Sequence, residues 1–326
     1  MRIAVDVGYS NVKAVSDCDS KIIFPSVVAP VKENPINGIG GFKTKHYYAK
    51  INNKESLTGD AAVRSLTGVS TLNREKPPEI HDLFILVASY LCGAGILNPT
   101  QKKDIHLAVG LPLAYYRSQK DDLKQRLLRL SATVSVDNGE AKYISFQNIT
   151  VLPQGLGILF AEDNLPDQGY IGLIDIGCFT TDYMLFAMED GYPVLIPDGC
   201  GSVEAGTYLV QQDLAAAFQS QTGAPLAHFM YADALKLAMN NEPIYFQGKE
   251  INLSGIYKQS CKETTQLILE AIRSVWVSRG EYLNSTIFAG GGSKMFENYL
   301  QKSFPATSII DDPIFANSQG FLKLIS

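Results

Sequence analysis

The chain of 326 residues is longer than most single hydrophobic cores, so we expect two domains. Its hydrophobic content of 46%, charged content of 19% and net charge of −5 are typical of a soluble globular protein and exclude a strongly basic surface for nucleic acid or anionic lipid. The five Cys and four His residues have no zinc-site spacing, so we expect reduced thiols and a cytoplasmic location.

The chain opens with an apolar strand, residues 2–5, which leads into the turn Asp6-Val7-Gly8-Tyr9-Ser10-Asn11-Val12-Lys13. This strand begins at once, so we expect no signal peptide or membrane anchor before it. A second strand is predicted over residues 21–28. Residues 30–75 lack helical periodicity and predict a small β-rich insert with one short helix at residues 60–65.

Pro77 and Pro78 open a helix over residues 79–91, since proline is tolerated in the first helical turn. The apolar run that contains this helix is too short to span a bilayer, so we interpret it as part of a core and expect no membrane partner. The elements that follow are a strand at 104–111, a helix started by Ser118, a hairpin region at 133–151 and a helix at 154–161.

A polar connector at residues 163–169 marks the expected change of domain. We assign residues 1–160 and 311–326 to domain I, and residues 161–310 to domain II with a small insert at about 220–257. The elements predicted in the second half are strands at 171–176, 183–186 and 285–289, a hairpin at 244–253, and helices at 203–220, 224–239, 260–282 (with Ser260 as N-cap), 294–300 and 313–324.

The stretch Gly172-Leu-Ile-Asp-Ile-Gly-Cys-Phe-Thr-Thr-Asp182 repeats the pattern of the first turn. Asp175 aligns with Asp6, Gly177 with Gly8, Thr180 with Asn11 and Asp182 with Lys13. A glycine turn between two strands gathers backbone N–H groups that can bind phosphate oxygens, and a carboxylate beside it can hold hydrated Mg²⁺ or orient a water. Two copies indicate an internal duplication with a ligand between the halves.

The strand at 285–289 runs into three glycines, Gly290, Gly291 and Gly292, before a helix. Glycines there let the backbone approach a nucleotide, although a tight turn with nothing bound explains the same residues. Glu204 stands where we expect the first turn of a helix. It could accept hydrogen bonds from ribose hydroxyls, or it could be only a partner of the helix dipole.

The order of these motifs resembles the superfamily of actin, sugar kinases and heat-shock chaperone ATPases. The first loop (residues 6–13), the connector Leu152-Pro153-Gln154-Gly155, the second loop (175–182) and the triple glycine carry the resemblance. The short length, Lys13 and the tail Asp312-Pro-Ile-Phe-Ala-Asn-Ser-Gln-Gly-Phe321 are most similar to bacterial and archaeal actin-like ATPases of the plasmid-segregating ParM/StbA type. The implied fold is α/β, a duplicated ribonuclease H-like, actin-like fold with two domains around a nucleotide cleft.

The resemblance also implies roles for particular residues. Asp6 and Asp175 would hold the shell of Mg²⁺, and Gln154 would position the attacking water; segregating actins often carry glutamate there, so we expect slow hydrolysis. The remaining residues expected to bind ATP (or GTP) are Gly8, Asn11, Lys13, Gly177, Thr180, Thr181, Glu204, Gly290, Gly291 and Gly292.

The implied function is a filament-forming ATPase that assembles with copies of itself. A separate DNA-binding adaptor, and not the filament protein, would bind the plasmid DNA. The alternative is a small-molecule kinase of the same fold. A kinase needs a further base for its acceptor hydroxyl, and no additional acid at a strand end suggests one. A chaperone ATPase would need a peptide-binding domain after residue 326, and a membrane-bound shape-determining actin would need an anchor before Asp6.

Overall fold

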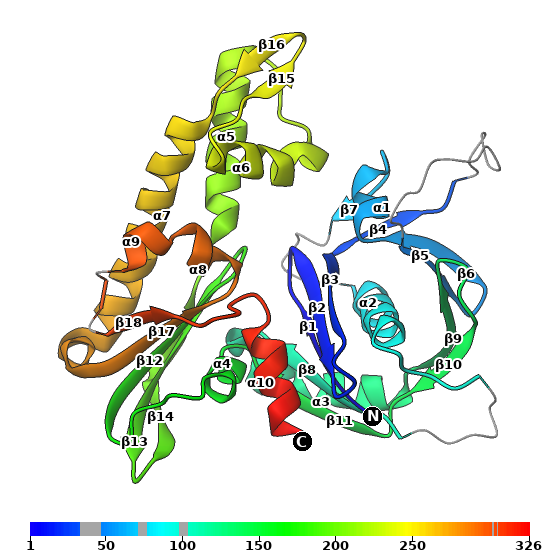
Figure 1. Ribbon diagram of the computed structural model, residues 1–326, viewed down its shortest axis with the longest axis horizontal. Coiled ribbons are helices and arrows are strands. Elements are labelled where there is room, and N and C mark those ends of the chain that lie inside the picture. The colour runs from blue at the N-terminus through cyan, green and yellow to red at the C-terminus, as the bar shows by residue number, and fades with distance from the viewer. Residues whose placement is uncertain (33–46, 71–76, 98–103, 302, 305) are drawn as a thin grey trace. The chain divides into compact units, whose positions relative to one another are not determined.

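The computed structural model describes residues 1–32, 47–70, 77–97, 104–301, 303–304 and 306–326. The chain forms two compact units (Figure 1). Unit 1 contains residues 1–161 and 317–326, and unit 2 contains residues 162–316. Both units combine β-sheets with helices, as expected of an α/β fold.

Unit 1 contains a five-stranded sheet, here called sheet A, with strand order β11-β8-β1-β2-β3. β1 pairs antiparallel with β2 and parallel with β8, which in turn pairs parallel with β11. The C-terminal ends of β1, β8 and β11 therefore lie at the same end of the sheet, where β1 continues into the first loop. The strands are β1 (Arg2–Val7), β2 (Asn11–Ser16), β3 (Lys21–Pro25), β8 (His106–Leu111) and β11 (Asn148–Pro153).

A second, six-stranded sheet B has the order β10-β9-β5-β6-β4-β7. The predicted β-rich insert is thus not a separate sheet, because two strands from residues 131–145 complete it. The strand predicted at 21–28 is also two strands in different sheets, divided at Ser26. The elements are β4 (Val27–Pro30), β5 (Tyr47–Ile51), β6 (Lys54–Thr58), β7 (Val69–Ser70), β9 (Ser131–Val136), β10 (Lys142–Ser145) and the short helix α1 (Asp60–Arg64).

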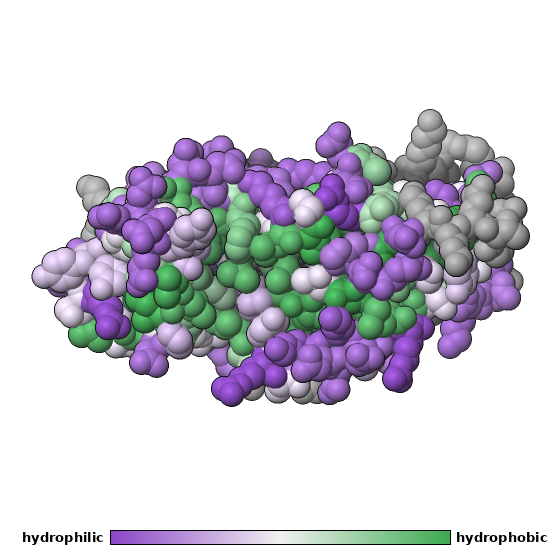
Figure 2. Space-filling view, turned by 90° about the horizontal axis from the view of Figure 1, so that it is seen from below, coloured by the Kyte–Doolittle hydropathy of each residue, from purple (hydrophilic) through white to green (hydrophobic). Residues whose placement is uncertain are grey.

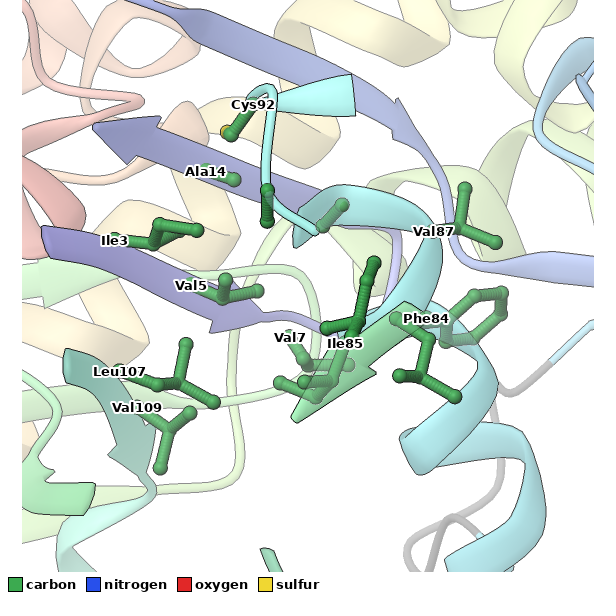
Figure 3. Close-up of a cluster of buried hydrophobic side chains, with 14 of the residues drawn as sticks. Ile3, Val5, Val7, Ala14, Phe84, Ile85, Val87, Cys92, Leu107 and Val109 are labelled. Carbon is green, nitrogen blue, oxygen red and sulfur yellow. The ribbon is translucent and has the colours of Figure 1, made fainter. Parts of the chain in front are cut away.

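Helix α2 (Pro78–Leu91) packs against strands of both sheets, so it supplies the centre of the unit 1 core. Figure 3 shows Phe84 and Ile85 of this helix among Val5 of β1 and Val109 of β8. All four side chains are essentially inaccessible to solvent. Removal of this much apolar surface from water stabilises sheet A and with it the edge that carries the first loop.

Helix α3 (Leu113–Arg129) packs on β8 and β11. It begins at Leu113, so the predicted start at Ser118 was wrong. Pro112 precedes the helix and fixes its entry, whereas the Ser118 hydroxyl donates to the Tyr115 carbonyl inside the helix. Helices α4 (Leu156–Ala161) and α10 (Ala316–Leu324) complete this part of the chain.

Unit 2 is built on sheet C, with strand order β14-β13-β12-β17-β18. Strand β14 was not predicted, and the helix expected from residue 203 begins four residues later. This strand is difficult to recognise in the sequence because it contains Pro193, Pro197 and two glycines, which are rare in strands. It nevertheless pairs with β13 along most of its length. The strands are β12 (Gly169–Ile176), β13 (Thr181–Glu189), β14 (Tyr192–Val203), β17 (Leu283–Ala289) and β18 (Thr307–Ile309).

Three helices, α5, α6 and α7, pack on one another in unit 2. The predicted N-cap Ser260 was wrong, because α7 begins at Ser254, whose N–H donates to Asn252 Oδ1 over 2.9 Å. The helix predicted at 224–239 is a short 3₁₀ turn followed by α6. The elements are α5 (Thr207–Thr222), α6 (Tyr231–Met239), α7 (Ser254–Trp276), α8 (Gly291–Met295), α9 (Glu297–Leu300), β15 (Ile244–Phe246) and β16 (Lys249–Ile251).

The second boundary between the units lies at residue 316, six residues after the expected position at 310. Two backbone hydrogen bonds hold this segment in unit 2. Ile310 N–H donates to Phe288 O over 3.1 Å, and Gly290 N–H donates to Pro313 O over 2.8 Å. Both bonds extend the end of β17 (Leu283–Ala289), which a sequence pattern does not reveal.

The surface mixes hydrophilic side chains with exposed apolar patches, as Figure 2 shows for one face. Among the described residues, no helix is both long and apolar enough to cross a bilayer.

Candidate functional site

The first loop carries an ion pair fixed by strand register. Asp6 of β1 lies directly opposite Lys13 of β2, and the distance from Lys13 Nζ to Asp6 Oδ2 is 3.0 Å. Asp6 is only 3% exposed. A carboxylate buried this deeply needs a partner, and Lys13 supplies its charge compensation.

Gln154 reaches the same carboxylate from β11. Its Nε2 donates to Asp6 Oδ1 over 2.7 Å, and its backbone N–H donates to Leu111 O over 2.7 Å. The two oxygens of Asp6 thus accept hydrogen bonds from different parts of the chain, Oδ2 from Lys13 in β2 and Oδ1 from Gln154 directly after β11. Because Nε2 faces Asp6, Oε1 is the atom of this amide that can accept a hydrogen bond from water.

Two residues that the sequence analysis did not assign support this loop. Ser26 is fully buried, its hydroxyl donates to Gly8 O over 2.7 Å, and its N–H donates to Ser10 O over 2.9 Å. Asn317 Oδ1 accepts from Gly155 N–H over 2.8 Å, next to Gln154. Asn317 belongs to the tail motif already quoted, whereas nothing in the sequence distinguishes Ser26.

The second loop is tied back in a similar way. Gly177 N–H donates to Thr180 O over 2.9 Å and closes the turn. Gly177 O and Cys178 O accept from Thr207 N–H (3.2 Å) and Tyr208 N–H (2.9 Å), both in the first turn of α5. In both loops, carbonyl oxygens therefore accept hydrogen bonds from one side of the turn. This arrangement favours backbone N–H groups that point to the opposite side.

A close backbone approach explains the glycine in each loop. A Cβ on Gly8 would lie 2.8 Å from Asn11 O, and a Cβ on Gly177 would lie 2.9 Å from Thr180 O. These are the residue pairs that the sequence aligned. The loops differ at one register position, because Asp175 faces Asp182 where Asp6 faces Lys13.

Thr181, one of the residues expected to bind ATP, uses its hydroxyl inside unit 2. Its side chain is fully buried, and Oγ1 donates to Ala205 O over 2.8 Å. This bond holds the chain after β14 against the second loop. Glu204 is exposed and precedes α5, so it is not a first-turn acid of that helix.

The triple glycine packs against the end of β12. A Cβ on Gly290 would lie 2.4 Å from Asp175 Oδ1, and a Cβ on Gly292 would lie 2.4 Å from Ile176 Cγ2. A Cβ on Gly291 would have no heavy atom within 4 Å. Unit 2 therefore brings Asp175, the second loop and these glycines together, with open space at Gly291.

Unit 1 contains a cavity of about 460 Å³ beside its loop. It is lined by loop residues, by Gln154 and by residues of α2 and α3, among them Gly8, Tyr9, His81, Tyr115 and Arg126. Arg126 joins the two helices, because Nη1 lies 2.7 Å from Asp82 Oδ1 and 2.9 Å from Pro78 O. Gln154 thus borders a space that can admit water.

Within the described ranges, no three His, Cys, Asp or Glu side chains form a group that could hold a metal ion by themselves. Asp6 in unit 1 and Asp175 in unit 2 are each the kind of ligand that Mg²⁺ takes, since this ion prefers oxygen ligands and is usually held by one or two carboxylates together with water and phosphate oxygens. The glycine turns and the open space at Gly291 fit a phosphate-bearing ligand.

Two family models match successive parts of the chain. Residues 4–157 match the model of the N-terminal domain of actin-like proteins. Residues 173–302 match the model of the C-terminal domain of the MreB-like archaeal actin homologue. An archaeal actin homolog from Thermoplasma acidophilum is 25% identical over 338 aligned positions, which cover 98% of this chain and 97% of the relative.

Solved structures give the same picture. A 15-stranded ParM filament from Clostridium botulinum is similar with a TM-score of 0.86 at 28% identity, covering 99% of this chain and 98% of that chain. An archaeal actin homolog in complex with ADP has a TM-score of 0.77 at 21% identity, with the same coverage, and supports the fold alone.

Proposed function

Because this chain belongs to the actin-like proteins, we propose that it binds ATP with Mg²⁺, assembles with copies of itself into filaments and hydrolyses the nucleotide. The observation that carries the proposal is the pair of loops with one geometry. In each loop, a Cβ placed on the glycine would lie only about 2.8–2.9 Å from a backbone carbonyl oxygen, so the position needs glycine. Carbonyl oxygens of each loop also accept hydrogen bonds from residues outside the loop.

The loops are assigned to the phosphates. Gly8, Asn11 and Lys13 of unit 1 bind phosphate oxygens, as do Gly177 and Thr180 of unit 2. Thr181 contributes through its backbone, since its hydroxyl is used by Ala205. Glu204 and the glycines 290–292 take the nucleoside. An archaeal actin homolog that shares this fold has been solved in complex with ADP.

Asp6 and Asp175 are the residues that would hold Mg²⁺, which when bound neutralises charge on the phosphate oxygens. Lys13 already compensates Asp6 at 3.0 Å. With a nucleotide bound, Lys13 would pair with phosphate oxygens in place of Asp6, which would leave the Asp6 carboxylate able to hold the metal.

Gln154 orients the attacking water. Its amide is held by Asp6 through Nε2, so Oε1 accepts a hydrogen bond from the water and fixes its position. Glutamine does not remove a proton, so hydrolysis is expected to be slow, as in other nucleotide hydrolases that use this residue. A slow reaction is suited to timing disassembly.

Self-assembly is the part of the proposal that the similarity to a ParM filament supports. The inserts at 30–75 and 220–257 are proposed as contact surfaces because the loops do not require them. Residues 33–46 and 71–76 of the first insert lie outside the described residues. Head-to-tail contacts of this kind are heterologous and give an open filament when the rotation does not close.

Plasmid segregation through a DNA-binding adaptor is the cellular role that we propose. The net charge of −5 provides no footprint for a polyanion, so the adaptor rather than the filament would contact DNA. Cytoplasmic location follows from this role.

The deciding experiment is negative-stain electron microscopy and pelleting of the purified protein with Mg²⁺ and ATP, ADP or no nucleotide. Filaments with ATP, together with phosphate release, support the proposal. A protein that stays monomeric at tens of micromolar and transfers phosphate to a small sugar or carboxylic acid would instead be a kinase of the same fold.

A further inference from the structure

The two units carry opposite net charge. Unit 1 has 20 Lys and Arg against 14 Asp and Glu, a net charge of +6, and unit 2 has 8 against 19, a net charge of −11. Residues 143–235 contain no Lys or Arg and eleven Asp and Glu. A division of charge this large creates long-range attraction between unit 1 of one copy and unit 2 of another.

The acidic unit also exposes an apolar edge. Strand β14 is an edge strand of sheet C, and Tyr192, Val194 and Leu195 are 75%, 43% and 47% exposed. Exposed acids flank them, Glu189 at the end of β13 and Asp198 within β14. Tyr192 and Val194 lie on one face of the strand and Leu195 on the other, so the apolar side chains flank the edge of the sheet on both sides. An apolar edge with an acidic border has the composition of an interaction surface.

The backbone of β14 argues against an added strand as the occupant. Pro193 and Pro197 lack an N–H group, so a strand laid along this edge would lose two potential donors. The surface is therefore suited to side chains of a helix rather than to β-sheet extension.

Helix α3 of unit 1 has the complementary composition. It carries five Lys and Arg against two Asp, and Arg117, Lys124 and Leu128 are exposed. These three residues are separated by seven and four positions, so they lie along one stripe of the helix, which also holds the exposed Asp121. Leu128 offers an apolar contact one helical turn from Lys124.

We propose that the β14 surface, defined by Glu189, Tyr192, Val194, Leu195 and Asp198, receives helix α3 of a second copy of this chain. The contact pairs different surfaces on the two copies and is therefore heterologous. It is additional to the insert contacts, and it rests on the proposed self-assembly. Its ionic part weakens as the Debye length falls from about 10 Å at 0.1 M salt.

The test is charge reversal, measured as the critical concentration for assembly with Mg²⁺ and ATP by light scattering and pelleting. Glu189→Lys with Asp198→Lys should raise the critical concentration about tenfold at low salt, because attraction becomes repulsion. Asp190 is left unchanged, since its φ of 52° favours Asp over Lys. The variant with Arg117→Glu and Lys124→Glu should show the same defect.

Rescue separates a broken contact from a damaged fold. A chain with all four substitutions should assemble within about twofold of wild type, because the charges are again complementary. The matched control, Glu270→Lys with Glu281→Lys, makes the same charge change at exposed positions elsewhere in unit 2 and should leave assembly unchanged.

Each outcome bears on one claim. Wild-type assembly that the Glu189/Asp198 variant retains overturns this inference and leaves the proposed function intact. A defect that the four-substitution chain fails to rescue, or that the control shares, overturns helix α3 as the occupant. Absence of wild-type assembly at every salt concentration overturns both the proposed function and the inference.

Discussion

Gln154 and Asp6 are 148 positions apart in the chain, and their side chains meet in a hydrogen bond of 2.7 Å from Nε2 to Oδ1. This bond determines which end of the Gln154 amide can face a water. Lys13 holds the second oxygen of the same carboxylate. Asp6 therefore positions Gln154 in addition to any part it has in binding the metal.

Replacement of Gln154 should separate nucleotide binding from hydrolysis. Gln154→Ala removes the amide proposed to position water, together with its hydrogen bond to Asp6, and leaves both glycine loops unchanged. Nucleotide affinity should therefore stay near wild type while the rate of phosphate release falls about tenfold or more. Asp6→Asn is the informative companion, since it should lower both rate and affinity. Wild-type phosphate release by Gln154→Ala would refute the role assigned to this residue.

Asp175→Ala should impair both binding and turnover. The substitution removes a carboxylate proposed for Mg²⁺ and leaves the second loop with a smaller residue at the end of β12. We expect nucleotide affinity measured with Mg²⁺ to fall by about tenfold or more, and the affinity measured in EDTA to fall much less. Equal losses under the two conditions would mean that Asp175 acts through the loop and not through the metal.

The triple glycine provides a matched pair of substitutions. Gly290→Ala places a Cβ 2.4 Å from Asp175 Oδ1 at a φ of 82°, and it should cost about 1–3 kcal/mol in stability together with nucleotide affinity. Gly291→Ala meets no atom within 4 Å and should keep wild-type stability. Thermal unfolding with and without nucleotide measures both effects; a Gly291→Ala variant that loses nucleotide affinity alone would place the ligand at that open space.

Cysteine labelling should report occupancy of the second loop. Burial raises the pKa of Cys92 to about 12, with a contribution from nearby Cys18, and burial raises the pKa of Cys261 to about 11. The thiolate is the reactive form, so neither should react with iodoacetamide near pH 8, whereas exposed Cys18 should. Nucleotide should protect Cys178 several-fold without protecting Cys18, as judged by mass spectrometry. Equal labelling of Cys178 with and without nucleotide would contradict the phosphate assignment of its loop.

The purified protein should not bind duplex DNA. Unit 2, with a net charge of −11, repels a polyanion, and the basic residues of unit 1 are interspersed with acids. Fluorescence anisotropy at 50 and 200 mM salt measures this. Tight, salt-sensitive binding would remove the need for an adaptor.

The parts of the fold that depend on local patterns could be predicted from the sequence. The two loops are short, each lies between adjacent strands, and their aligned residues share one backbone geometry. Strand β14 escaped prediction because its prolines and glycines are typical of loops, and pairing with β13 outweighs that local preference. The start of α7 escaped because Asn252, which is not in the helix, caps it.

The contacts that build the candidate site are harder to predict because they join distant residues. Gln154 could be assigned from the connector motif, but its bond to Asp6 depends on the order of β11, β8 and β1 in sheet A. The support from Ser26 depends on a single buried hydroxyl with no neighbouring pattern. The hydrogen-bond partner of Thr181 could not be predicted either, because a threonine beside a glycine turn gives no sign of which acceptor its hydroxyl will find.

Helix α10 packs against α4 almost backbone to backbone, since a Cβ on Gly320 would lie 1.8 Å from Gly157 O. Asn317 in the same helix holds Gly155 beside Gln154. Residues 317–326 therefore have to leave the ribosome before unit 1 can close, although its other strands and helices were made before unit 2 began. A nascent chain therefore acquires the supported form of Gln154 only after all of unit 2 has been made.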